Sequence, residues 1–327
     1  MKPPAKRSGS TKYSMTSTLN KVVNLYKPAG PTSFDMVWSV KKILGVEKAG
    51  HIGTLDPDAE GMLPICLNRS TRIIQFLSSQ SKIYLAGMEL GKATDTQDAS
   101  GKVIAEADPG GITEKDLIEV MQGMMGRQKQ VPPMFSAKKK NGIPLYKLAR
   151  NGITIERKPV AITLFSLKFT QKDGNRVFFE VHCSSGTYVR TLCHDIGEKL
   201  GCHAHLFRLV RTQVGVFDKT SSLTLETLKS ASQDGSLSGR LISQEQALEF
   251  LPAIQIDPEH TPSVANGVGI SRSVLKSAPG RFARGDFFRI SDSQGKMVAV
   301  AESLVDSEML ANLPPRQIAF KLKRVLL

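Results

Sequence analysis

The most informative stretch of the sequence is Gly50-His51-Ile52-Gly53-Thr54-Leu55-Asp56-Pro57-Asp58-Ala59-Glu60-Gly61. Glycine and proline recur too often here for a helix or a strand, so the stretch predicts a constrained loop. The loop carries one histidine and three carboxylates, and loops that hold such side chains in fixed positions commonly face a ligand. An acidic, solvated turn is the alternative, and the neighbouring sequence decides between the two.

Two other constrained motifs accompany this loop. Lys27-Pro28-Ala29-Gly30-Pro31-Thr32-Ser33 is a turn cluster that no helix can cross, and it follows a short apolar run, Val22–Leu25, that predicts a strand. Ser185-Gly186-Thr187-Tyr188-Val189-Arg190 follows another predicted strand and places an aromatic ring two residues before a guanidinium. An arginine so placed can pair bidentately with a carboxylate and keep it ionised. The acidic loop therefore has a candidate partner in Arg190.

The remaining periodicity predicts a mixture of helices and strands. Thr32 or Ser33 caps a helix that ends at Gly45, and Thr113 with Asp116 forms a capping box for a second helix. Further helices are predicted over 71–77, 188–200 and most of 226–250, the last broken at Asp234-Gly235. Strands are predicted over 83–90, 161–171, 176–184, 253–256, 287–290, 297–302 and 318–326. The fold class that follows is mixed α/β.

Charge is the clearest feature of the composition. Lys and Arg outnumber Asp and Glu by 44 to 30, which gives a formal net charge of +14 and indicates a polyanionic partner. A surface charged only for solubility is the alternative. The excess gathers at both ends: residues 1–20 hold four basic residues and no acidic one, and residues 262–327 hold ten basic and five acidic ones. The first of these segments predicts a disordered basic arm.

Composition shifts divide the chain into three parts: 1–20, 21–251 and 252–327. Short strands alternate with Gly and Pro turns after Pro252, which indicates a small β domain. Within the large part, residues 128–158 are basic and rich in turns, and we expect a mobile arm there. Its run Lys138-Lys139-Lys140 fits contact with phosphate or a solvated surface.

Several classes of protein and site are excluded. No secretory segment begins the chain and no apolar stretch reaches a membrane-spanning length, so we expect a cytoplasmic protein. Four cysteines without a Cys-x-x-Cys pair fit reduced thiols. The His and Cys residues between His182 and His205 match no common zinc spacing. A small-ligand hydrolase is excluded because the chain has neither a nucleophile elbow nor a phosphate loop.

Together these motifs resemble the bacterial tRNA pseudouridine synthase B family, whose members act on the uridine at tRNA position 55. The resemblance covers about Val22 to Gly215, and the motifs agree in order and spacing. Besides the loop Gly50–Gly61, they are Lys27–Ser33, Ser81-Lys82-Ile83-Tyr84, Thr94–Asp98 with Gly101, and Gly186–Arg190. Beyond Pro252 the similarity is weaker and fits a small β-barrel RNA-binding module of the PUA type. One departure is Asp58-Ala59-Glu60, which is more acidic than the family pattern.

The resemblance implies a role for each candidate site residue. Asp56 corresponds to the catalytic aspartate, Tyr84 to the aromatic residue that stacks on the target base, and Arg190 to the partner of Asp56. Substrate-binding roles are implied for His51 within the opened tRNA loop, for Tyr188 and Leu209 in the uracil pocket, for Lys27 beneath the catalytic loop, and for Asp98 near the target. By residue type alone, Tyr84, Tyr188 and Leu209 would also fit ordinary core positions, and Arg190 would also fit an exposed position on the surface. Asp95 lies three residues from Asp98 and could correspond to the same family aspartate.

The same resemblance implies a pseudouridine synthase fold with a largely antiparallel central sheet, and a reaction without metal or organic cofactor. The reaction breaks the bond from uracil N1 to ribose C1′, turns the base, and joins C5 to C1′. Because the target lies inside a folded loop, it must be flipped out. Attack by Asp56 on C1′, attack on C6 and deprotonation of the ribose are all open routes, and the acceptor of the C5 proton is open as well.

We expect the partner to be the T-arm stem-loop of tRNA, bound by a monomer. The main alternative is a non-catalytic tRNA-binding protein or tRNA chaperone with the same fold and charge. Asp56 argues against it, because a carboxylate buried in a polyanion-binding cleft repels phosphate and costs desolvation.

Overall fold

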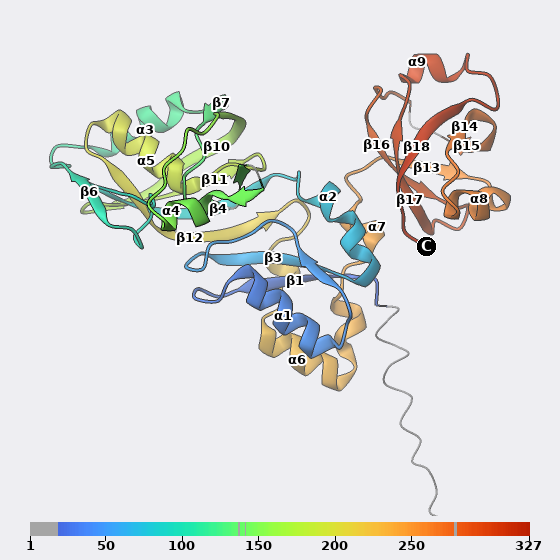
Figure 1. Ribbon diagram of the computed structural model, residues 1–327, viewed down its shortest axis with the longest axis horizontal. Coiled ribbons are helices and arrows are strands. Elements are labelled where there is room, and N and C mark those ends of the chain that lie inside the picture. Colours follow the sequence, from blue (N-terminus) through green and yellow to red (C-terminus); the bar gives the residue numbers. More distant parts are fainter. Residues whose placement is uncertain (1–18, 137, 141, 278–279) are drawn as a thin grey trace, which may run out of the picture.

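The computed structural model describes residues 19–136, 138–140, 142–277 and 280–327, so residues 1–18 of the expected basic arm lie outside the described residues. Two sheets dominate these residues, one of eight strands and one of six (Figure 1). The predicted mixed α/β class is confirmed. In the described part of the chain, no helix is long and apolar enough to cross a membrane.

The larger sheet is antiparallel except where β12 meets β3, which run parallel. Its strands, in spatial order, are β1 (Val22–Lys27), β3 (Glu60–Leu67), β12 (Ala204–Val214), β4 (Lys82–Leu90), β11 (Arg176–Cys183), β10 (Val160–Asp173) and β7 (Gly126–Gln130), with β2 (Ala49–His51) added beside β3. The sequence did not predict β12, although this strand lies at the centre of the sheet. Its alternation is broken by charged residues such as Arg211, which is buried.

Helices pack against both sheets, and the longer ones have one apolar face and defined ends. The predicted capping boxes are present: Thr32 accepts from the backbone of Asp35 at the start of α1 (Ser33–Leu44), and Thr113 does so with Asp116 at α3 (Glu114–Gly123). The other helices are α2 (Ile74–Leu77), α4 (Leu145–Arg150), α5 (Val189–Leu200), α6 (Leu225–Asp234), α7 (Gln244–Ala247), α8 (Thr261–Ala265) and α9 (Ser307–Leu310). The break expected at Asp234-Gly235 within the helical segment 226–250 is confirmed, since Gly235 is left-handed and ends α6.

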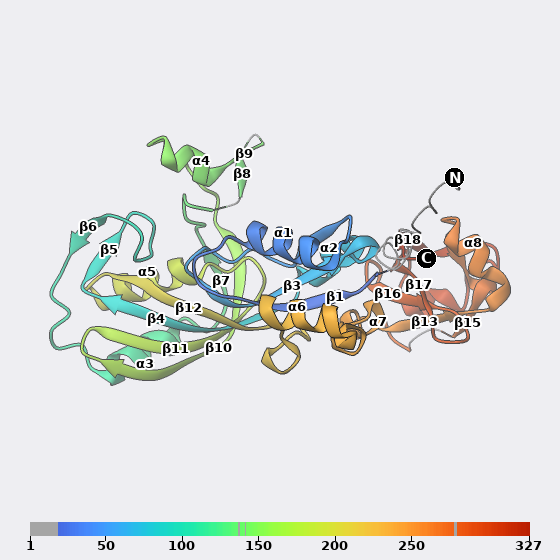
Figure 2. The same cartoon turned by 90° about the horizontal axis from the view of Figure 1, so that it is seen from below.

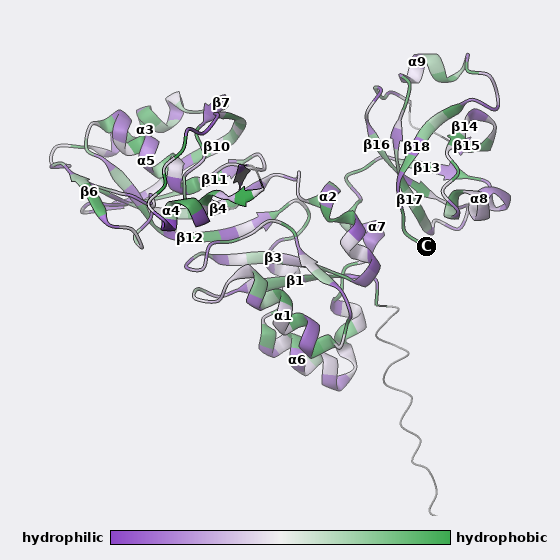
Figure 3. Cartoon of the chain, viewed as in Figure 1, coloured by the Kyte–Doolittle hydropathy of each residue, from purple (hydrophilic) through white to green (hydrophobic). Residues whose placement is uncertain are grey.

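The six-stranded sheet follows Pro252 and curls into a small barrel-like unit (Figure 1). Its order is β14 (Ile270–Ser271), β18 (Ile318–Val325), β17 (Met297–Ser303), β16 (Phe287–Ser291), β13 (Ala253–Ile256) and β15 (Leu275–Ser277). The four strands predicted here are confirmed. β17 is largely apolar along its length and fills the centre of this unit (Figure 3).

Apolar residues connect the two sheets. Val300 of the second sheet and Leu326, which follows β18, share one buried cluster with Val22, Ile73 and other residues of the first part. Two polar contacts reinforce this junction: Arg72 Nη1 donates to Val325 O at 2.7 Å, and Arg289 Nε donates to Leu251 O at 2.9 Å. Removal of the second sheet would therefore expose apolar surface.

Two expectations about irregular segments are corrected. The constrained loop is shorter than Gly50–Gly61, because both ends of that stretch join strands β2 and β3. The arm expected over 128–158 begins later, since residues 128–130 belong to β7 and pair with β10. Beyond them, β8 (Lys139–Lys140), β9 (Ile143–Pro144) and α4 stand out from the sheet (Figure 2). A separate small hairpin is formed by β5 (Lys92–Thr94) and β6 (Val103–Glu106).

Candidate active site

Two buried cations hold the backbone of the constrained loop between β2 and β3. Lys27, at the end of β1, is fully buried, and its Nζ donates to Pro57 O and Ala59 O, both at 2.7 Å, and to Pro28 O at 2.8 Å. These bonds hold the half of the loop after Asp56. They agree with the supporting role that the resemblance implied for Lys27.

Arg211 holds the other half of the loop, and the sequence analysis missed it. Its guanidinium is buried and donates to Met62 O at 2.7 Å, Gly53 O at 3.0 Å and Thr54 O at 3.4 Å. Gly61 allows β3 to approach this residue, because a Cβ on Gly61 would lie 2.1 Å from Arg211 O. No local signal was available, because the strand that carries Arg211 was not predicted and its carbonyl acceptors lie far away in the sequence.

Arg190 joins the two aspartates that the sequence singled out. Its Nε lies 3.1 Å from Asp56 Oδ2, and its Nη1 lies 3.0 Å from Asp98 Oδ2. Its Nη1 also donates to Thr96 O at 3.3 Å, and its Nη2 donates to Phe135 O at 2.9 Å. The guanidinium is 8% exposed, so it is not the surface arginine of the alternative interpretation.

Neighbouring hydroxyl groups hold the Asp98 carboxylate in place. Its Oδ1 accepts from Thr96 Oγ1 at 2.7 Å and from Ser100 Oγ at 2.6 Å, while Oδ2 faces Arg190. Asp98 therefore orients the guanidinium plane, and the guanidinium orients Asp56. Asp95 instead accepts from the Lys102 backbone, away from this network.

Asp56 remains accessible within this network. Its side chain is 45% exposed, whereas that of Asp98 is 21% exposed. Desolvation raises the pKa of Asp56 above its usual value, and the adjacent Arg190 charge opposes that shift. A reachable carboxylate held at a fixed angle suits a nucleophile or a base.

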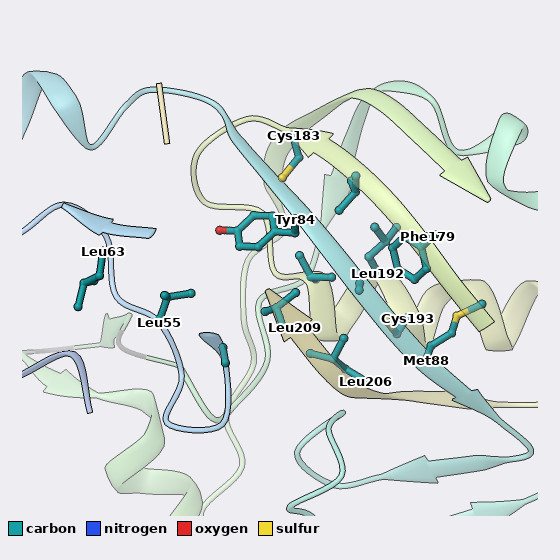
Figure 4. Packing of buried hydrophobic residues seen from close by; sticks show 14 of the residues in the cluster. Leu55, Leu63, Tyr84, Met88, Phe179, Cys183, Leu192, Cys193, Leu206 and Leu209 are labelled. Carbon is teal, nitrogen blue, oxygen red and sulfur yellow. The ribbon is translucent and has the colours of Figure 1, made fainter. Parts of the chain in front are cut away.

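Tyr84 and Leu209 form the apolar wall beside the loop. Tyr84 is 9% exposed on β4, and Leu209 is 8% exposed on β12, so both belong to the main core and also border the site. Figure 4 shows Leu209 beside Tyr84, whose hydroxyl points toward the segments that carry Leu55 and Leu63. Burial raises the pKa of Tyr84, and the neighbouring Arg211 charge opposes the shift.

Tyr188 and His51 are placed by backbone contacts. Tyr188 precedes α5, and its backbone N–H and C=O both bond the Gln130 side chain, at 2.8 and 3.1 Å. His51 ends β2, and its buried Nδ1 has no partner within the described residues. Burial lowers the pKa of His51, so its neutral form is favoured.

The structure thus brings Asp56, Arg190 and Asp98 into direct contact, with Lys27 bound to the catalytic loop. Glu60, one of the extra acidic residues, accepts from Tyr26 Oη at 2.9 Å. Within the described residues, no group of three or more His, Cys, Asp or Glu side chains could hold a metal ion.

We predict a pH-dependent contribution of Lys27 to stability. Burial lowers its pKa to about 8 from 10.5, so between these values the unfolded chain binds the proton that the folded protein has lost. The free energy of unfolding of the parent should therefore rise with pH in this window relative to Lys27→Met, by about 1 to 3 kcal/mol in total. Urea denaturation at pH 7.5 and 10 measures the difference. Lys168→Met, whose side chain is 70% exposed, is the control, and an equal pH dependence in both variants would contradict the prediction.

The sequence matches known families over most of its length. Residues 41–189 match the TruB family pseudouridylate synthase N-terminal domain, and residues 190–249 match the tRNA pseudouridylate synthase B C-terminal domain. The chain belongs to the TruB family. It is 44% identical over 292 residues to the tRNA pseudouridine synthase B of Geotalea uraniireducens, covering 88% of this chain and 93% of that protein. The protein of the same name from Syntrophotalea carbinolica is 43% identical over 250 residues, covering 76% and 81%.

Solved structures agree with this TruB assignment. A chain in the crystal structure of a Cbf5-Nop10-Gar1 complex has a TM-score of 0.79 and 29% identity, covering 96% of this chain and 86% of that one. A chain in an H/ACA RNP bound to a substrate RNA containing 2′-deoxyuridine has a TM-score of 0.76 and 28% identity, covering 94% and 85%. The pseudouridine synthase fold is therefore confirmed, and the protein is a TruB-family isomerase.

Proposed function

We propose that this protein is the tRNA pseudouridine synthase that isomerises the uridine at position 55 in the T-loop of tRNA. The observation that carries the proposal is the accessible Asp56 carboxylate, held by Arg190 beside Tyr84 and Leu209. The names of the relatives and the net charge of +14 support a tRNA substrate. A tRNA substrate also supports the cytoplasmic location expected from the sequence.

In the proposed reaction, the target uridine leaves its stack and enters the space beside Asp56. The bond from N1 to C1′ breaks, the base turns, and C5 bonds to C1′ while the C5 proton is lost and N1 regains a proton. Asp56 acts as nucleophile or base, and Arg190 keeps its carboxylate ionised and oriented. Tyr84, Tyr188 and Leu209 would enclose the uracil ring.

A non-catalytic tRNA-binding protein is less consistent with this site. Such a protein gains nothing from a carboxylate in its binding surface, because the negative charge repels phosphate. Here Asp56 and Asp98 share one buried guanidinium, so an aspartate pair with a single cation faces a polyanion. We also propose that the protein acts as a monomer, since Asp56, Arg190 and Asp98 already meet within one chain.

Two basic regions would hold the tRNA outside the site. The arm residues from 131 to 158 include the α4 side chains Lys147 and Arg150, and we propose that this segment contacts the RNA backbone. The barrel-like sheet, residues 252–327, would serve as a PUA-like RNA-binding domain, with exposed Lys321 and Arg324 on β18.

We predict that shape, not sequence alone, defines the substrate. An isolated T-arm stem-loop should be modified nearly as well as whole tRNA, whereas a linear strand with the same loop sequence should not. The measurement is pseudouridine mapping on the three RNAs at equal concentration. Equal activity on the linear strand would overturn shape recognition, and failure on the stem-loop would mean that the arm or the second sheet reads another part of tRNA.

A further inference from the structure

Helix α1 presents two aromatic rings to solvent. Phe34 is 74% exposed and Trp38 is 58% exposed, and Lys42 continues the same exposed stripe at i, i+4 and i+8. The stripe spans about 12 Å along the helix. The opposite face of α1 carries Met36, Val37, Val40 and Leu44, which are buried, so packing of the helix does not require the exposed rings.

Positive charge accompanies these rings. Lys42 Nζ lies 5.2 Å from the centroid of the Trp38 ring, a cation–π distance. Two acidic residues are close in sequence, Asp35 and Glu47. The Asp35 carboxylate is engaged in the helix cap, where it accepts from the backbone and hydroxyl of Thr32 at 2.9 and 2.6 Å.

The stripe begins at the catalytic loop. Ser33, the residue before Phe34, accepts from Leu55 N at 2.9 Å and donates to Leu55 O at 3.0 Å, so the first turn of α1 is bonded to the residue before Asp56. Helices α1 and α4 lie on the same side of the large sheet (Figure 2). Phe34 is therefore the residue next to a side chain that bonds the Asp56 loop, and Trp38 lies about one turn further along α1.

Beyond α1, exposed basic residues continue toward the second sheet. Lys48 is exposed, and its carbonyl accepts from Asn68 N at 2.8 Å, which joins it to the turn that bears exposed Arg69 and Arg72. Arg72 then reaches Val325 O on β18. A basic route thus connects the aromatic stripe with the barrel-like sheet.

We propose that Phe34 and Trp38 stack on unpaired bases of the bound tRNA while Lys42 meets an adjoining phosphate. The proposal rests on the proposed function, which supplies a tRNA substrate. Exposed aromatic rings interleaved with lysines are the usual means of holding unpaired RNA bases. A second copy of the chain is a poorer occupant, because each copy carries a net charge of +14.

Trp38 is the single tryptophan of the chain, so its fluorescence reports on this stripe alone. The experiment titrates unmodified tRNA into Asp56→Asn protein, which prevents turnover, and follows binding in parallel by filter retention. We expect quenching of Trp38 emission that saturates together with binding. Saturated binding without a change in Trp38 emission would overturn the proposal. A concentration-dependent change without RNA would do the same, since it would indicate self-association.

Affinity measurements with variants give the second readout. Phe34→Ala and Trp38→Ala should each weaken tRNA binding by about fivefold or more, and Trp38→Phe should retain most of the affinity because a ring remains. Lys42→Gln should make the slope of log affinity against log salt concentration shallower by about 0.7 to 0.9. Ile104→Ala, which removes a 65% exposed apolar side chain from β6, is the matched control and should bind as the parent does. Unaltered affinity in both alanine variants would contradict the stacking role.

The parent's activity separates this inference from the proposed function. If the parent forms pseudouridine in tRNA but Trp38 does not respond to binding, only the stacking role fails. If the parent binds tRNA and quenches Trp38 but forms no pseudouridine, the proposed function fails and the binding surface stands.

Discussion

Replacing Asp56 with asparagine should abolish pseudouridine formation while leaving tRNA binding nearly intact. Asparagine keeps the size and polarity of the side chain but loses the charge that Arg190 pairs with at 3.1 Å, and it can act neither as the nucleophile nor as the base. We expect the single-turnover rate to fall by roughly 10⁴-fold or more. The rate is measured at saturating protein, and tRNA affinity is measured separately by filter retention.

Asp58→Asn is the matched control for this experiment. Asp58 lies two residues away in the same loop and is exposed, and the substitution removes the same charge. Its rate should stay close to that of the parent. Turnover by Asp56→Asn near the parent rate would contradict the assignment of Asp56, and equal losses in both variants would mean that net loop charge, not one carboxylate, is required.

The second large effect is expected for Arg190→Lys. Lysine keeps the positive charge but cannot bond Asp56, Asp98, Thr96 O and Phe135 O at once, as the guanidinium does. Asp56 would lose its fixed angle, and we expect a fall in turnover of about 10²-fold with a modest loss of affinity. Single-turnover rates and Kd values distinguish the two effects.

The control for this variant is Arg176→Lys, in which the arginine is exposed on β11 and lies 3.7 Å from Glu89. This exposed ion pair should contribute little to stability, so the turnover rate and the tRNA affinity of Arg176→Lys should be unchanged. Because Arg190 is buried, thermal unfolding must confirm that Arg190→Lys is folded. A folded variant with parental turnover and weakened binding would make Arg190 a phosphate contact.

Local sequence signals predicted those parts of the fold whose causes are themselves local. The caps at Thr32 and Thr113 are defined by side chains within one helical turn, and both are present. The hairpin of β10 and β11 follows from alternation on either side of a turn. Strand β12 escaped prediction because its pairing with β4 and β3 is non-local, and its buried Arg211 is satisfied only by carbonyls far away in the sequence.

The candidate site also has a part that local sequence signals predict and a part that depends on the folded chain. Asp56 and Arg190 could be proposed as partners because a carboxylate in a constrained loop needs a cation. Arg190 also pairs with Asp98 and donates to Phe135 O. These contacts could not be predicted, because they join segments that only the folded chain brings together. The role of Leu209 was not predictable from residue type, since its burial is ordinary for a core leucine and only its place beside Tyr84 makes it part of the site.

The most direct test of the account is to map pseudouridine in an unmodified tRNA transcript after incubation with the parent and with Asp56→Asn, under conditions where both proteins bind it. We expect pseudouridine at the T-loop uridine with the parent and none with the variant. Absence of the product with folded, tRNA-bound parent, or formation at the same rate by both proteins, would contradict it.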